Sequence, residues 1–150
     1  MKGRITAETK LKNTMDKQTF LSRLEEQGVV FPFPWMVVST RELSELLSIP
    51  LQTIHNWEIR GKGPVPVTHG VWRGNRRYRR IADVIAWLDD VPVWTVYRDW
   101  LLEKYINLSL STPKQCEEFI NDLIAKRVYV QPRWKLKRYN VLPFVTLGRE

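Results

Sequence analysis

The chain has 150 residues, of which 43% are hydrophobic, so it can bury one main core but is short for two full domains. Its 24 Lys and Arg residues against 16 Asp and Glu give a formal charge of +8, which favours nucleic acid as a partner ahead of an acidic membrane surface. No apolar run approaches the roughly 18 residues of a membrane-spanning helix, and no signal peptide precedes the first polar stretch, so we expect a soluble, cytoplasmic protein with no membrane partner.

Residues 1–34 are predicted to form an N-terminal arm, a short helix and a connector. Residues 1–14 lack hydrophobic periodicity, which is typical of a mobile arm. Apolar residues recur at helical spacing over 15–27, so we expect a short amphipathic helix there, ended by the glycine that follows. Pro32 and Pro34 then forbid a helix and favour an extended connector.

Residues 35–90 are predicted to form the principal domain, which begins with two helices separated by a tight turn. Ser39 and Glu42 have the spacing of a capping box, so a helix of two turns should begin directly after Ser39. The tripeptide that ends in Pro50 interrupts this helix, and a proline is well tolerated where a second helix begins. The second helix should cover about 51–60 and end at the glycines and prolines that follow.

A β-hairpin wing and a third helix complete this domain. Valines at both ends of 65–67 favour a short strand, and a Gly74-Asn75 turn within 71–80 predicts a hairpin. Trp72 lies either at the exposed tip of that hairpin or packed beneath it. The third helix should follow from about Ile81.

Residues 91–150 are predicted to form a helical extension and a basic tail. Helices are expected over about 94–106 and 113–127. The remaining residues, 128–150, alternate apolar and basic side chains, which fits short strands or an extended arm. This tail is either a second DNA contact or a strand that pairs with another protomer. The fold class is therefore mainly α with a small β-hairpin wing, and the extension is expected to serve oligomerisation or partner binding.

The second helix of the principal domain is predicted to have one apolar and one polar face. The apolar residues expected to pack together across the three helices are Leu43, Leu46, Leu47, Ile49, Ile54, Trp57, Val84, Trp87 and Leu88. The side chains left on the opposite face are Gln52, Thr53, Asn56 and Arg60. Gln and Asn can pair bidentately with adenine, Thr can contact a phosphate or a thymine methyl group, and Arg can bind guanine or the backbone. We therefore predict that these four residues read bases; the alternative is a solvated helix face.

Four sequence blocks within 35–88 occur in a recognisable order. They are Ser39-Thr40-Arg41-Glu42-Leu43-Ser44-Glu45-Leu46-Leu47, Thr53-Ile54-His55-Asn56-Trp57 followed by Arg60-Gly61, Arg76-Arg77-Tyr78-Arg79, and Ala82-Asp83-Val84-Ile85-Ala86-Trp87-Leu88. Together they resemble the excisionase and MerR-like winged helix-turn-helix superfamily. The resemblance implies a DNA-binding module whose hairpin lies beside the recognition helix and touches phosphates or the adjacent minor groove. The segment 70–75 makes this wing longer than the compact type.

Basic residues are concentrated around the predicted wing. Between Glu58 and Asp83 the chain carries seven basic residues and no acidic one. Such a run favours contact with the DNA backbone, although basic runs can also be simply solvated. The predicted backbone and wing contacts are Thr40, Arg41, His55, Lys62, Arg73, Arg76, Arg77, Arg79 and Arg80. For His55, the alternative to a phosphate contact is a structural or solvent-facing role.

Residue patterns that carry catalysis or bind metal are not found in the sequence. The single cysteine, Cys116, excludes an internal disulfide, and with two isolated histidines it cannot complete an ordinary zinc site. No nucleophilic triad, paired-carboxylate motif or glycine-rich phosphate loop is present. We therefore expect neither enzymatic activity nor a cofactor or metal.

The sequence favours a sequence-specific double-stranded DNA-binding protein. It would be a transcriptional regulator or an excisionase-like recombination directionality factor of a mobile element such as a phage, binding cooperatively or as a homo-oligomer. A recombinase or a replication protein is a possible partner. The alternative is a DNA-anchored adaptor or replication accessory protein whose C-terminal region recruits another protein.

Overall fold

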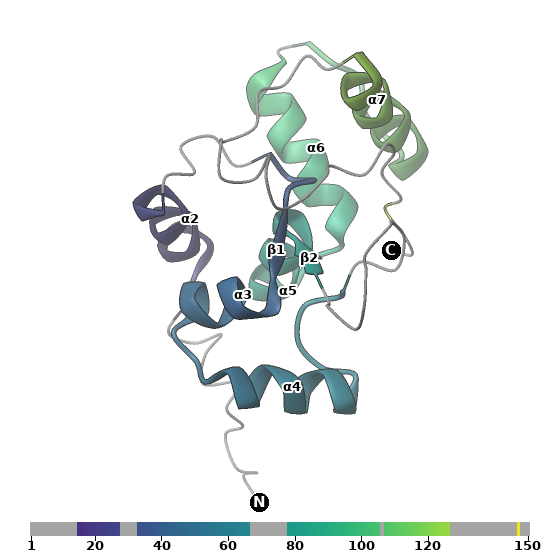
Figure 1. The fold of residues 1–150 in the computed structure, drawn as a ribbon. Helices are drawn as coiled ribbons and strands as arrows, with labels where there is room; N and C mark the ends of the chain where they lie inside the picture. The colour runs from purple at the N-terminus through teal and green to yellow at the C-terminus, as the bar shows by residue number, and fades with distance from the viewer. Residues whose placement is uncertain (1–14, 28–32, 67–77, 106, 127–146, 148–150) are drawn as a thin grey trace, which may run out of the picture.

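Helices dominate the computed structural model, which describes residues 15–27, 33–66, 78–105, 107–126 and 147. The elements in chain order are α2 (Lys17–Glu26), β1 (Val37–Ser39), α3 (Thr40–Leu47), α4 (Leu51–Arg60), β2 (Tyr78–Arg80), α5 (Ile81–Asp89), α6 (Val93–Lys104) and α7 (Pro113–Lys126) (Figure 1). The mainly α fold class is therefore confirmed. The described strands form a two-stranded antiparallel sheet.

Helix α2 occupies the place where a short amphipathic helix is predicted. The Asp16 side chain accepts a hydrogen bond of 2.8 Å from the backbone N–H of Thr19, which caps the helix, and Phe20 and Leu24 are buried. On the same helix, the guanidinium of Arg23 donates to the backbone oxygen of Leu46 at 2.7 Å. This bond satisfies a carbonyl at the C-terminal end of α3 and so ties the two helices together.

Helices α3 and α4 have the boundaries that the sequence predicts. Glu42 N–H donates to Ser39 Oγ at 3.1 Å, and Ser39 N–H donates to Glu42 Oε1 at 2.9 Å, which completes the capping box. Helix α3 ends where Ser48 takes the left-handed conformation, with a φ of 55°. Three residues then connect it to α4, whose N-cap is Pro50. The result is a pair of helices joined by a tight turn.

The segment after α4 is a loop and not the strand predicted to begin at Val65. Gly61 and Gly63 adopt positive φ angles of 69° and 80°, and Val65 is exposed. A Cβ on Gly63 would lie 2.8 Å from the ring of Trp57, so this glycine lets the loop close over the helix. The prolines that alternate with valine here lack the N–H groups that a strand ladder needs. Residue 67, the end of the predicted strand, lies outside the described residues.

Strand β1 is the element that the sequence analysis missed. Val37 pairs with Arg80 and Ser39 with Tyr78, so β1 and β2 run antiparallel and bring together residues about 40 positions apart in the chain. Backbone N–H of Ile81 donates to the oxygen of Met36 at 2.8 Å, which fixes the start of α5 beside the sheet. The remainder of the predicted hairpin wing, with Trp72 and the Gly74-Asn75 turn, lies outside the described residues, as do the arm at 1–14 and the tail at 128–146.

Helix α5 is the most deeply buried helix, and α6 and α7 extend the same core. Residues 81–86 are all buried, and α5 contacts β2, α2 and α6, while α7 packs on α6 (Figure 1). The hydrophobic cluster includes Phe20 of α2, Leu46 of α3 and Ile120 of α7, so the segments 1–34, 35–90 and 91–150 all contribute to it. All nine apolar residues predicted to pack within 35–88 belong to this cluster or pack against it, with Ile49 and Trp87 only partly buried. Among the described residues, no helix combines the length and the apolar character needed to cross a membrane.

Candidate nucleic-acid interface

Helix α4 lies at one end of the molecule, beyond α3, and turns one face outward (Figure 1). Its inner face is set by Ile54 and Trp57, whose exposed fractions are 0% and 5%. At 3.6 residues per turn, the residues that point directly away from this pair fall at positions 52, 55, 56 and 59. All four are exposed, and we call the surface formed by Gln52, His55, Asn56 and Ile59 the outer face of α4.

Two amide side chains of the outer face are joined by a hydrogen bond. Gln52 Nε2 donates to Asn56 Oδ1 at 3.2 Å, one helical turn away. The bond holds both side chains on the same side of the helix and leaves amide donors and acceptors available to solvent. Such a pair can present hydrogen-bonding groups to the edge of an adenine.

The other two predicted base-reading residues flank the outer face. Thr53 is half-buried at one edge of the helix, whereas Arg60 is exposed at its C-terminal end. Among the predicted backbone contacts, Arg41, His55 and Lys62 are exposed. The structure therefore brings Gln52, His55 and Asn56 together and places Thr53 and Arg60 beside them.

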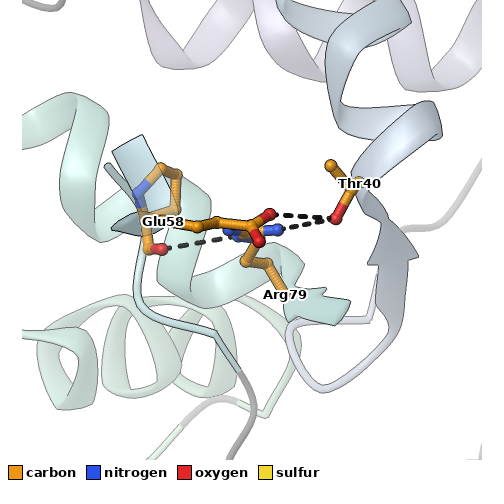
Figure 2. Close-up of polar contacts among 4 residues, drawn as sticks. Thr40, Glu58 and Arg79 are labelled. Carbon is orange, nitrogen blue, oxygen red and sulfur yellow. Dashed lines mark hydrogen bonds and ion pairs between the residues drawn. The ribbon is translucent and has the colours of Figure 1, made fainter. Parts of the chain in front are cut away.

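The carboxylate of Glu58, which is the only acidic side chain in α4, is held by an arginine from the sheet. Arg79 Nη2 lies 3.1 Å from Glu58 Oε1, and Arg79 Nη1 donates to Thr40 Oγ1 at 3.0 Å (Figure 2). The Thr40 hydroxyl donates in turn to Glu58 Oε1 at 3.3 Å, and Arg79 Nε makes a longer bond of 3.5 Å to Pro64 O. The outer face consequently carries no carboxylate that would repel phosphates.

This network corrects the prediction that Arg79 and Thr40 contact the DNA backbone. Arg79 is 1% exposed, and its guanidinium is surrounded by protein acceptors. Thr40 is half-buried, and its hydroxyl both accepts and donates within the same network. Both side chains join β2, α3 and α4 together, so neither is available to a phosphate.

The prediction that Arg80 contacts the DNA backbone is also wrong. Its Nε donates to Asp83 Oδ2 at 2.9 Å, both residues are buried, and the guanidinium carbon lies 5.9 Å from the centroid of the Tyr97 ring. Burial raises the pKa of the Asp83 carboxyl group, and the adjacent Arg80 opposes that shift. The pair therefore lies between the start of α5 and the Tyr97 ring of α6. The other predicted wing contacts, Arg73, Arg76 and Arg77, lie outside the described residues.

Ile59 is a member of the outer face that was not predicted from the sequence. Its side chain is 83% exposed, although isoleucine is usually buried. A signal for its position was present, because buried Ile54 and Trp57 define a helical stripe to which residue 59 does not belong.

A groove on another part of the molecule is lined by α2, α5 and α6 and by no residue of α4. Its volume is about 700 Å³, and its aromatic lining comes from Phe33, Trp100 and Tyr105. Lys17 and Glu103 add charges to its lining. Within the ranges that the structure describes, no three His, Cys, Asp or Glu side chains are grouped so as to hold a metal ion.

Cys116 lies on α7 and is fully buried. Burial raises the pKa of its thiol to about 11, partly offset by Arg98. The thiol is therefore protonated at neutral pH and a poor nucleophile there.

Comparisons of this chain with protein-family models, with curated proteins and with solved structures find no match.

Proposed function

We propose that this chain is a cytoplasmic, sequence-specific double-stranded DNA-binding protein of the winged helix-turn-helix class, with α4 as the helix that enters the major groove. The observation that carries the proposal is the outer face of α4, where hydrogen-bonding amides stand beside a histidine and the one carboxylate of the helix is turned inward onto Arg79. An α-helix with its side chains is about 10–12 Å across, which matches the width of the major groove of about 12 Å.

The distribution of charge supports this proposal. Within the described residues acidic side chains outnumber basic ones, so the cationic excess of the whole chain resides in the remaining segments, which include 67–77 and 127–146. Arg41 and Lys62 are exposed cations near the two ends of the α3–α4 pair. In the proposed complex these two residues, together with Arg73, Arg76 and Arg77, bind phosphates and position α4.

We further propose that the protein works by occupying and bending a site, without chemistry of its own. A single recognition helix reads only a few base pairs, so useful specificity requires two or more copies on repeated sites. The biological role would be that of a transcriptional regulator or of an excisionase-like directionality factor on a mobile element.

The experiment that tests this function is selection of bound sites from a random duplex library by the full-length protein. A short consensus, repeated at a spacing near one helical turn of DNA, is the expected result. The affinity for the selected duplex and for its scrambled version is then measured at several salt concentrations. Equal affinity for both duplexes would overturn sequence-specific binding.

An adaptor or replication accessory protein is the second candidate, and the groove between α2 and α6 favours it. Aromatic side chains, such as those in the lining of this groove, are enriched at surfaces that bind proteins, and polar groups form the rims of such surfaces. Deletion of residues 93–150 cannot separate the two functions, because α6 and α7 contribute to the common core. Glu103→Lys, which reverses an exposed charge in the lining of the groove, addresses the question instead: an adaptor would lose a partner while its DNA affinity is kept.

A further inference from the structure

Ile59 is an exposed aliphatic side chain near the C-terminal end of the outer face of α4, whose other members are polar. It is the most exposed of the large hydrophobic side chains on the described part of the molecule, with 83% of its surface accessible. Asn56 precedes it by one helical turn and Gln52 by two, so all three lie in one row along the outer face of α4. An isoleucine in this position gains nothing for folding and exposes apolar surface to water.

The surroundings of Ile59 favour DNA over a protein as its partner. A protein-binding surface centred on an exposed isoleucine normally has further apolar side chains around it. Here the neighbours along the face are two amides and His55, all exposed, and Arg60 follows immediately. The carboxylate of Glu58 is bound by Arg79 and held away from this face. Side chains of this kind, with cations and no free carboxylate, are complementary to a polyanion.

Amide and aliphatic groups in one row match the major-groove edge of A·T pairs. Adenine presents N6 and N7 to a bidentate Asn or Gln, and thymine presents its 5-methyl group to an apolar side chain. Asn56 and Ile59 are separated by three residues, which is about 4.5 Å along the helix axis at 1.5 Å per residue. A base-pair step is about 3.4 Å, so their targets lie one or two steps apart.

We propose that Ile59 is a specificity-determining residue that contacts the 5-methyl group of a thymine next to the adenine read by Asn56 or Gln52. This inference rests on the proposed function, since it assigns one base contact within the same interface. It also requires two neighbouring A·T pairs in the recognised site. Ile59 acts by excluding water from the methyl group, so its contribution to the binding affinity depends on the presence of that methyl group.

The test is a double-mutant cycle between Ile59→Ala and removal of single thymine methyl groups. Each thymine of the selected duplex is replaced in turn by deoxyuridine, which keeps base pairing and removes only the methyl group. At one position this change should weaken binding of the unsubstituted protein by about 4-fold, the value expected for one buried methyl group. Ile59→Ala should weaken binding to the thymine duplex by a similar factor or more and should be insensitive to deoxyuridine at that position.

Leu102→Ala provides the matched control, because Leu102 is also an exposed aliphatic residue but lies on α6. This variant should keep the affinity and the sensitivity to deoxyuridine. Thermal unfolding of Ile59→Ala should match that of the unsubstituted protein, because the side chain contributes nothing to the core.

Three results would overturn the inference. Additive effects of Ile59→Ala and deoxyuridine at every thymine would show that Ile59 touches no methyl group, while the proposed function would stand if the selected duplex still bound specifically. A change of oligomeric state in Ile59→Ala without DNA would assign the residue to a protein contact. Absence of sequence-specific binding in the unsubstituted protein would remove both the inference and the proposed function.

Discussion

Arg79 of β2 and Glu58 of α4 form an ion pair of 3.1 Å in which the side chains are only 2% and 12% exposed. The pair connects β2, the last part of the predicted wing, to the proposed recognition helix, and Thr40 at the start of α3 joins both partners. Its geometry therefore sets how α4 is presented relative to the sheet, and the pair neutralises the one acidic side chain of that helix.

Loss of the arginine should be costly, because it leaves a largely buried carboxylate without its cation. Arg79→Met is expected to lower the free energy of unfolding by about 3–5 kcal/mol, as measured by urea denaturation. The double variant Arg79→Met, Glu58→Gln should recover part of this loss, because no charge is then left uncompensated. If Arg79→Met instead kept full stability and only weakened DNA binding with a smaller salt slope, the structural role assigned here would be wrong.

The outcome for Arg79 shows where local sequence reasoning fails. A run of arginines is normally predicted to lie on the surface, because charged side chains are rarely buried without a partner. The partner of Arg79 is Glu58, which is 21 positions away in the sequence. Local sequence patterns therefore do not reveal the pair. By contrast, the bounds of α3 and α4 follow from signals within a few residues, namely the capping box at Ser39, the start at Pro50 and the end at Gly61.

Strand β1 was missed for a related reason. It has three residues, too few for an alternating pattern, and its pairing with β2 is decided by residues about 40 positions further along. The outer face of α4 was predicted more successfully, because buried Ile54 and Trp57 fix the orientation of a regular helix. Ile59 was overlooked because hydrophobic residues are expected to be inside.

The two amides of the outer face should determine which sequence is bound. Asn56→Ala or Gln52→Ala is expected to reduce the preference for the selected duplex over its scrambled version by about 1–3 kcal/mol, with little effect on the scrambled duplex. Gln18→Ala is the matched control, since Gln18 is an exposed glutamine on α2. Equal weakening on both duplexes, measured by fluorescence anisotropy, would argue against base reading by these amides.

An exposed cation beside α4 should bind DNA phosphates and contribute equally to the affinity for every DNA sequence. Lys62→Ala is expected to weaken binding to selected and scrambled duplexes by the same factor and to reduce the slope of log K against log salt by about 0.9. Arg77→Ala, in the predicted wing, is expected to behave in the same way. Lys114→Ala removes an exposed lysine from the distant α7 and should leave the slope unchanged; a slope that falls equally in this control would mean that only net charge matters.

The buried thiol of Cys116 should make the protein lose stability at alkaline pH. In the unfolded chain this thiol ionises near pH 9.0, whereas burial raises its pKa to about 11 in the folded protein. Between these values the unfolded state has released a proton that the folded state retains, so the free energy of unfolding falls as the pH rises, by at most about 1.4 kcal/mol per pH unit. Well below pH 9 the thiol is protonated in both states and its contribution is constant.

Cys116→Ala isolates this contribution from the other groups that titrate at high pH. Loss of the side chain changes the free energy of unfolding by the same amount at every pH. Between pH 9 and pH 11, the free energy of unfolding of the variant should fall less steeply than that of the unsubstituted protein. Urea unfolding at half-unit steps of pH measures the difference between the two curves. Curves that remain parallel through this window would show that the folded thiol ionises as readily as the unfolded one, and hence that Cys116 is reached by solvent.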